Sequence, residues 1–245
     1  MPEPKSVPRK SASKKGAPAA KAPKAIVPVP VGPEILSEAF RRFREIEAEP
    51  KGELEHVNPY TLLVAVVLSA QATDAGVNKA TRALFAVADT PQKMLDLGEE
   101  ALLDYLKSIN FFRTKAKNVI ALSRRLVEEF GGEVPASVEI LETLPGVGRK
   151  TASVVVNMAF GIPRIAVDTH IFRVSNRIPL VVTKEPLETQ TALEGLVPDE
   201  FRLHAHHWLI LHGRYICKAR LPECWRCPIR DLCRYEPKTP DPAAA

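Results

Sequence analysis

The chain has 245 residues, of which 45% are hydrophobic, and carries a formal net charge of +5 at pH 7. This length allows one large domain or two smaller ones with a substantial core. The longest apolar run, the 13 residues 60–72 (YTLLVAVVLSAQA), is shorter than the ~20 residues that cross a bilayer. We therefore expect no membrane association and assign this run to a buried core helix.

The positive charge is concentrated near the N-terminus. Residues 1–30 contain seven Lys or Arg against one acidic residue, whereas the other 215 residues contain 27 basic and 28 acidic side chains. Residues 1–32 are also rich in Ala and Pro and lack apolar periodicity, which predicts a disordered basic tail with nonspecific affinity for polyanions. Residues 236–245 are predicted to form a second disordered tail. Any nucleic-acid surface on the remaining chain must come from local patches.

From residue 33 onward the sequence predicts one helix after another. Asn58 and Thr73 are candidate N-caps, each directly before a helical pattern. The segments PRIAV and LVVT are too short to build a sheet, so the fold class is all-α. The helical patterns lie at 33–49, 60–72, 75–88, 98–109, 115–132, 137–144, 150–161, 168–178, 185–197 and 199–216. No change in composition marks a domain boundary.

The stretch LPGVGRKTA (144–152) places two glycines beside a lysine, a composition that often binds phosphate. A nucleotide P-loop is excluded because Arg149 separates Gly148 from Lys150 and the first glycine of that motif is missing. A dinucleotide fingerprint is excluded because threonine replaces its third glycine and no strand precedes it. The remaining pattern is helix, tight turn, helix. Gly146 and Gly148 permit positive φ and expose backbone N–H groups to a DNA phosphate, with an ordinary helix connection as the alternative.

All four cysteines lie within 17 residues near the C-terminus, in the spacing C-x6-C-x2-C-x5-C, and are Cys217, Cys224, Cys227 and Cys233. The N-terminal residues lack the apolar centre of a secretory signal, so we expect a metal site and not a disulfide framework. Zinc ribbons usually join two C-x2-C pairs, whereas a single pair flanked by lone cysteines is closer to iron–sulfur ligation. Zinc remains the alternative.

Two side chains are candidates for catalysis. Lys150 stands at the start of a helix, where the helix N-terminus and partial burial would favour the neutral amine that a Schiff-base nucleophile needs. Binding to phosphate or solvent is the commoner role of such a lysine taken alone. Asp168 follows an apolar run and is an N-cap as well as a candidate catalytic carboxylate. The histidines of residues 204–212 match no standard ligand pattern, and the pair Phe111 and Phe112 could stack on bases or pack in the core.

Motifs in a fixed order resemble the endonuclease III family, which are DNA glycosylase/AP lyases of the helix-hairpin-helix superfamily. The motifs are LSAQATD, LPGVGRKTA, AVDTHIFRV, HHWLILHGRY and the cysteine spacing, and the similarity extends from about residue 33 to residue 235. The resemblance implies two helical lobes flanking a DNA-binding cleft. One would be a six-helix barrel over 52–162, with a helix-hairpin-helix at about 137–160, and the other would combine 33–51 with 163–235 and carry the iron–sulfur loop.

The resemblance also implies roles for residues of this chain. Lys150 would be the nucleophile that attacks the sugar of a damaged nucleotide, and Asp168 would stabilise positive charge at the sugar or help to deprotonate Lys150. Gln71 would fill the gap left by the flipped nucleotide. The implied contacts to the DNA backbone are Gly146, Gly148, Arg149, Lys218 and Arg220. The implied ligands of a [4Fe-4S] cluster are Cys217, Cys224, Cys227 and Cys233.

Two positions depart from the family pattern. Asn110 occupies a turn position where glycine is usual, and we expect the turn to survive because Asn tolerates positive φ. Glu223 makes the cysteine loop less basic than is usual. This departure bears on the share of DNA affinity that Lys218 and Arg220 would supply.

The function that the resemblance implies is base-excision repair. The enzyme would remove oxidised pyrimidines from duplex DNA and cleave the strand 3′ to the abasic site by β-elimination. We expect a [4Fe-4S] cofactor, a monomer, double-stranded DNA with damaged pyrimidines or abasic sites as the partner, and a bacterial-type cytoplasmic location at the nucleoid. The rivals are an adenine-specific glycosylase of the same superfamily, a noncatalytic DNA-binding protein and an electron-transfer protein. Lys150 argues against the first, and Lys150 and Asp168 together argue against the second.

Overall fold

The computed structural model describes residues 29–244, so the tail predicted over residues 1–28 lies outside the described residues. Within that range the chain contains helices and no strand, which confirms the all-α class, and no helix there is long and apolar enough to cross a bilayer. The α-helices are α1 (Pro33–Ile46), α2 (Pro59–Ser69), α3 (Asp74–Val87), α4 (Pro91–Leu106), α5 (Phe112–Phe130), α6 (Val138–Leu141), α7 (Arg149–Phe160), α8 (Thr169–Arg177), α9 (Pro186–Leu196) and α10 (Asp199–Tyr215).

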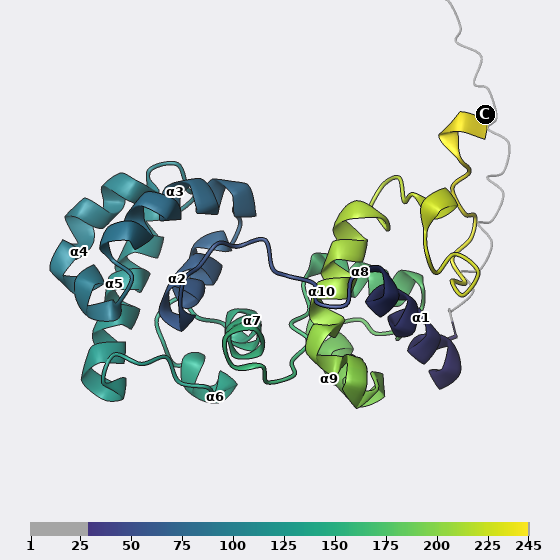
Figure 1. The fold of residues 1–245 in the computed structure, drawn as a ribbon, viewed down its shortest axis with the longest axis horizontal. Coiled ribbons are helices and arrows are strands. Elements are labelled where there is room, and N and C mark those ends of the chain that lie inside the picture. The colour runs from purple at the N-terminus through teal and green to yellow at the C-terminus, as the bar shows by residue number, and fades with distance from the viewer. Residues whose placement is uncertain (1–28, 245) are drawn as a thin grey trace, which may run out of the picture.

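The helices form two groups that lie side by side (Figure 1). The first lobe comprises α2 to α7, and the second lobe comprises α1, α8, α9, α10 and the cysteine loop, residues 217–233. Each lobe has its own cluster of buried apolar side chains. The N-terminal helix therefore packs with the C-terminal part of the chain, and the first lobe is an insertion between α1 and α8.

Helix α2 is the centre of the first lobe. Its residues 60–68 are all buried, as the sequence predicts for this apolar run. The side chain of Asn58 accepts a hydrogen bond from the N–H of Thr61 at 2.8 Å, and Thr61 Oγ1 accepts one from the N–H of Asn58 at 3.0 Å. This capping box fixes the start of the helix. The other end of α2 leads directly into the turn that contains Gln71.

Helix α4 differs from its predicted extent. It begins at Pro91, where the side chain of Thr90 accepts the N–H of Lys93 at 3.2 Å, whereas the sequence pattern predicts a helix only from Gly98. Gly98 has φ 79° and ψ 164°, which breaks the helix in its middle. The segment before this break is shorter than the windows in which apolar periodicity can be recognised, so the sequence did not reveal it.

Residues at both ends of the described range make hydrogen bonds or ion pairs. Val31 is buried in the second lobe, and its N–H donates to the carbonyl of Pro179 at 3.0 Å. At the other end, Lys238 Nζ pairs with Glu236 at 2.7 Å, and a short 3-10 helix spans residues 242–244. The contact of Val31 joins the start of the described range to the second lobe, whereas the contacts at the other end are local.

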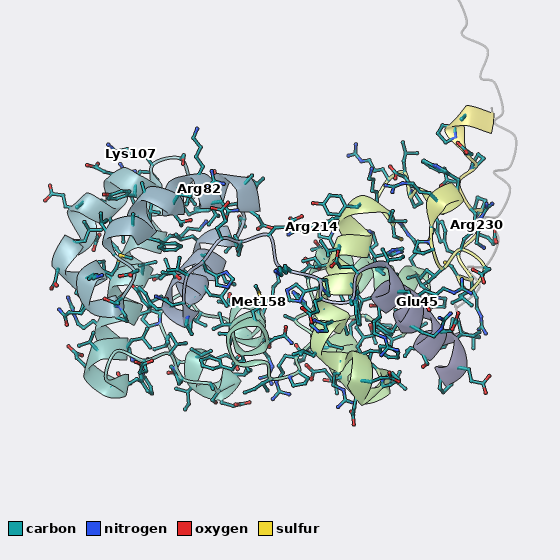
Figure 2. All side chains as sticks on the ribbon, in the orientation of Figure 1. Glu45, Arg82, Lys107, Met158, Arg214 and Arg230 are labelled. Atoms are coloured by element: carbon teal, nitrogen blue, oxygen red, sulfur yellow. The ribbon has the colours of Figure 1, made fainter. Side chains whose placement is uncertain are left out.

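Side chains from both lobes join across the boundary between them. Arg214 of α10 donates to Asp74 Oδ2 of α3 at 2.6 Å. Asn157 of α7 donates to the carbonyl of Leu203 in α10 at 3.0 Å. Figure 2 shows Met158 and Arg214 between the two groups of helices. These contacts hold the lobes together at the place where the candidate catalytic residues meet.

Candidate active site

The glycine stretch forms a tight turn between α6 and α7, as predicted. Leu144 and Val147 are buried in the first lobe and anchor the turn, with the N–H of Val147 donating to the carbonyl of Leu144 at 3.1 Å. Gly146 between them has φ 77°, in the left-handed region that favours glycine. A Cβ at this position would lie 2.7 Å from Asn118 Nδ2. Backbone conformation and packing therefore both require glycine at position 146.

Gly148 differs from Gly146. It is the N-cap of α7 with φ −96°. The sequence allows positive φ at both glycines, and of the two only Gly146 adopts it. A Cβ on Gly148 would meet no heavy atom within 4 Å, and no side chain caps the N–H groups of the first turn of α7. Neither conformation nor packing requires glycine here. The space and the N–H groups are therefore open to a partner, and a helix N-terminus favours an anion.

Lys150 and Asp168 line one open cavity of about 420 Å³. Lys150 lies in the first turn of α7 and is exposed, whereas the sequence predicts partial burial. Asp168 comes from the second lobe and is the N-cap of α8, where its Oδ1 accepts the N–H of Ile171 at 2.8 Å. The fold brings together at the lobe boundary two side chains whose proximity the sequence alone cannot establish.

A smaller cavity of about 80 Å³ shares part of its wall with the first, namely Ser69, Asp74, Lys150 and Arg214. His206 and His207 also line it. Burial disfavours the imidazolium form and lowers the pKa of His206 to about 3 and that of His207 to about 4, so both rings are neutral at pH 7. The sequence favours packing of these histidines in the core or on the surface, and the structure buries both beside the candidate nucleophile.

Arg214 is a site residue that sequence reasoning missed. It lines both cavities, donates to Asp74 Oδ2 at 2.6 Å and pairs with Glu53. The hydroxyl of Tyr215 also donates to Glu53. The partners of Arg214 come from segments far away in the chain, so no local motif could reveal the network. Charge-assisted hydrogen bonds of this kind fix the guanidinium in the shared wall of the two cavities.

Gln71 lies in the turn after α2, with an exposed side chain and φ 56°. Asn110 Nδ2 donates to the carbonyl of Gln71 at 3.1 Å. The left-handed residue of this turn is Phe111, the N-cap of α5, with φ 59°, and not Asn110 as expected. Phe111 is 65% exposed, whereas Phe112 packs against the core of the first lobe. Only the first of the two aromatic rings is therefore free to stack on a base.

The cations predicted to contact the DNA backbone are neutralised to different degrees. Arg149 pairs with Glu142 at 3.2 Å. Lys218 pairs with Glu223 at 2.5 Å, and this lysine together with a neighbouring arginine lowers the pKa of the Glu223 carboxyl. Arg220 is exposed and enters neither pair. The reduced basicity expected for the cysteine loop thus has a structural cause in Glu223.

The four cysteines line one cavity at the end of the second lobe, and none of them forms a disulfide. Within residues 29–244, no three His, Cys, Asp or Glu side chains converge closely enough to hold a single ion. The four cysteines thus share a cavity without closing on a single point. Burial raises the pKa of the Cys227 thiol to about 12 and also raises the pKa values of Cys217 and Cys233. Their thiolates would be stabilised by a positively charged centre between them.

The surroundings of the sulfurs fit an iron–sulfur centre. An Arg177 N–H donates to Cys217 Sγ at 3.7 Å, and the backbone N–H of Tyr235 donates to Cys233 Sγ at 3.5 Å. Hydrogen bonds to the sulfurs are among the features that tune such centres. Arg177 also donates to the carbonyl of Lys218 at 2.6 Å, which ties the same arginine to the start of the loop. The residues present therefore suit a cluster held by four thiolates.

Comparison with known proteins defines the class of this protein. Residues 64–199 match the family model described as HhH-GPD superfamily base excision DNA repair protein, where HhH stands for helix-hairpin-helix. This segment includes the glycine hairpin, Lys150 and Asp168. The chain is thus a base-excision repair protein with the helix-hairpin-helix DNA glycosylase fold.

Individual relatives narrow the class. The chain is 57% identical to Endonuclease III of Treponema pallidum (strain Nichols) over 194 residues, which are 79% of this chain and 92% of that protein. It is 53% identical to Endonuclease III of Escherichia coli (strain K12) over 201 residues, 82% of this chain and 95% of that one. A trapped endonuclease III–DNA covalent intermediate superposes with a TM-score of 0.77 and 42% identity, covering 83% of this chain and 96% of that one. The chain belongs to the endonuclease III family and is a bifunctional DNA glycosylase and AP lyase.

Proposed function

We propose that this glycosylase/lyase removes oxidised pyrimidines from duplex DNA through a Schiff base on Lys150 and cleaves the strand 3′ to the abasic site by β-elimination. One observation carries the proposal: Lys150 and Asp168 come from different lobes and line one open cavity. Lys150 also follows Gly148 by only two residues, so a phosphate bound at the start of α7 would hold the adjacent sugar near the amine.

The proposed reaction proceeds in two stages. The neutral amine of Lys150 attacks C1′ of the flipped nucleotide, the bond from C1′ to the base breaks, and the base leaves with the electron pair and takes up a proton. Loss of a proton from nitrogen and opening of the sugar ring give an imine between Nζ and C1′. Removal of a proton from C2′ then lets the 3′ phosphate leave, which breaks the strand. Water finally hydrolyses the imine and releases Lys150.

Asp168 is the proposed catalytic carboxylate. The N–H of Ile171 holds its Oδ1 at the start of α8, which fixes the group at the cavity wall. From there it can stabilise positive charge at the sugar or take a proton from Lys150. The variant Asp168→Asn keeps an N-cap acceptor and separates these roles. A loss of rate that is constant with pH indicates charge stabilisation, and a loss that disappears at high pH indicates proton removal.

Two segments of the first lobe are assigned to the DNA duplex. At the hairpin, the open N–H groups after Gly148 support binding of one phosphate, with Gly146 and Arg149 beside them. At the turn after α2, Gln71 would fill the gap left by the flipped nucleotide. Phe111 follows the asparagine that binds this turn, and its exposed ring would stack on a base.

The cysteine loop is proposed to hold a [4Fe-4S] cluster through Cys217, Cys224, Cys227 and Cys233. When bound, such a cluster supplies a rigid cross-link among four points of the loop. The loop would then present Lys218 and Arg220 to the DNA backbone. Because Glu223 neutralises Lys218, we assign the larger contribution to Arg220.

The two separate cores support a division into domains at 52–162, with the helix-hairpin-helix at about 137–160, and at 33–51 plus 163–235. Double-stranded DNA containing damaged pyrimidines or abasic sites would bind between them. A single copy of the chain supplies every proposed contact, which supports a monomer. The relatives named above are bacterial, and a chromosomal substrate would place this enzyme in the cytoplasm at the nucleoid.

Borohydride trapping tests the proposed chemistry. The protein is incubated with duplex DNA containing an abasic site or an oxidised pyrimidine, and borohydride reduces the imine to a stable adduct. We expect the wild type and Lys107→Ala to form the adduct, because Lys107 lies at the far side of the first lobe in Figure 2. Lys150→Ala should form none. Absence of an adduct with the wild type, or its persistence in Lys150→Ala, would refute the assignment of the nucleophile.

A further inference from the structure

Lys115 is a buried lysine in the first turn of α5. It is 6% exposed, although its neighbour Lys117 in the same helix is exposed and looks similar in the sequence. Its Nζ donates to the carbonyls of Leu68 at 2.9 Å and Ala70 at 2.7 Å, both at the C-terminal end of α2. The ammonium group therefore satisfies carbonyls that the helix itself leaves unpaired, at the negative end of the helix dipole.

A second side chain near the start of α5 holds the turn that follows α2. Gln71 has φ 56°, a backbone conformation that a residue with a side chain keeps only where its surroundings hold it. Asn110, two residues before α5, donates from Nδ2 to the carbonyl of Gln71 at 3.1 Å. Side chains at the start of α5 thus bind three carbonyls at the end of α2, those of residues 68, 70 and 71.

The same part of α5 contacts the glycine hairpin. Asn118 follows Lys115 by three residues, which places both on one side of the helix. The Cβ of Asn118 is 2.9 Å from where a Cβ on Gly146 would stand. The first two turns of α5 therefore contact both segments that the proposed function assigns to DNA, namely the Gln71 turn and the hairpin.

We propose that Lys115, together with Asn110, is a positioning residue that holds the turn after α2 in the conformation that presents Gln71 to the DNA duplex. This rests on the proposed function, in which Gln71 fills the gap left by the flipped nucleotide. Neither Lys115 nor Asn110 lines the cavity that contains Lys150 and Asp168. They act through Gln71. Their removal should therefore slow the reaction only on DNA in which a gap must be filled, and it should leave the chemical steps themselves unchanged.

The test compares an abasic site in duplex DNA, where strand pairing leaves a gap in the stack, with the same site in single-stranded DNA, where it does not. The variants are Lys115→Met, Asn110→Ala and Gln71→Ala. The matched control is Lys117→Met, which removes an exposed lysine from the same helix. The measurements are the single-turnover rate of strand cleavage and the yield of the borohydride-trapped adduct, with folding checked by circular dichroism.

We expect Lys115→Met and Asn110→Ala to lower the rate on duplex DNA by roughly 10- to 100-fold, the loss that accompanies a displacement of about 1 Å in a positioning group. On single-stranded DNA the rate should change by less than about twofold, as for a group that is not coupled to the chemistry. Adding Gln71→Ala to Lys115→Met should cause little further loss, because both changes remove one interaction. Lys117→Met should leave both rates at the wild-type value.

Equal losses on both substrates, no loss on duplex DNA, or additive losses of Lys115→Met and Gln71→Ala would overturn the proposal and leave Lys115 a purely structural role. If Lys115→Met does not fold, Asn110→Ala decides by the same comparison, because it removes one hydrogen bond of an exposed side chain. If Gln71→Ala alone leaves the duplex rate unchanged, the gap-filling role itself is wrong. That result is distinguishable because this variant keeps both Lys115 and Asn110.

Discussion

The two hairpin glycines provide a matched pair of substitutions, Gly146→Ala and Gly148→Ala, because the fold requires glycine at only one of them. At Gly146 the φ of 77° places an alanine in the left-handed region, which costs roughly 1–2 kcal/mol. The new methyl would also lie 2.9 Å from the Cβ of Asn118, an atom that cannot rotate away. Relieving that overlap costs about 1–3 kcal/mol more.

The sum for Gly146→Ala, roughly 2–5 kcal/mol, corresponds to a fall in Tm of roughly 4–20 °C for a chain of this size. At Gly148, φ is −96° and a methyl meets no atom within 4 Å, so the folded state accepts alanine without strain. Replacing a glycine N-cap by alanine costs at most about 1 kcal/mol, or less than about 4 °C in Tm.

For DNA binding we expect the larger effect from Gly148→Ala, the substitution that the folded state accepts without strain. The Gly148→Ala methyl stands in the space through which a phosphate would reach the N–H groups of α7. Loss of that contact should raise the Kd for an abasic-site duplex by roughly tenfold, equivalent to about 1.4 kcal/mol. Thermal melting and fluorescence anisotropy measure the two effects separately. Our account of the hairpin would be refuted by a Gly146→Ala protein that melts with the wild type or by a Gly148→Ala protein that binds DNA as tightly as the wild type.

Three further outcomes follow from individual contacts. Glu223→Gln should free Lys218 and steepen the salt dependence of DNA binding by about one ion, as anisotropy at several salt concentrations would reveal. Burial lowers the pKa values of His206 and His207 to about 3 and about 4, so stability present above pH 6.5 should be lost as pH falls, by about 2 kcal/mol each at pH 5. Urea unfolding that is equal at pH 7 and pH 5 would contradict this. Tyr60→Phe should lower the unfolding free energy by about 1 kcal/mol in the same assay, because its hydroxyl bonds a buried serine at 2.6 Å.

Features that depend on local sequence could be predicted well. The run at 60–72 is too apolar for a surface helix, and its residues 60–68 form the buried centre of the first lobe. Asn58, Thr73 and Asp168 were expected as N-caps, and each accepts a backbone N–H at the start of a helix. In these cases the residue type and its immediate neighbours already determine the hydrogen bond. The cysteine spacing likewise anticipates that four thiols line one cavity.

Features that depend on packing between distant segments could not be predicted. In the sequence Lys115 is one basic residue in a helical pattern, and its burial depends on where the end of α2 lies. The left-handed conformation of Phe111 depends on the start of α5, and Asn110 was the residue expected to adopt it. Arg214 meets partners from two other segments. Each of these contacts joins residues that no motif contains together.

The arrangement of the lobes explains why a catalytic pair can be split between them. The proposed nucleophile, Lys150, begins a helix of the first lobe, and the proposed carboxylate, Asp168, caps a helix of the second. Their separation is therefore set by the contacts that join the lobes, of which the ion pair between Arg214 and Asp74 lies in the wall of the same cavity. DNA bound to the hairpin and to the cysteine loop would contact both lobes. A change in the separation of the lobes on binding would act directly on the ion pair between Arg214 and Asp74. Under the proposed function, substrate binding and the geometry of Lys150 and Asp168 would therefore be coupled through the contact between Arg214 and Asp74.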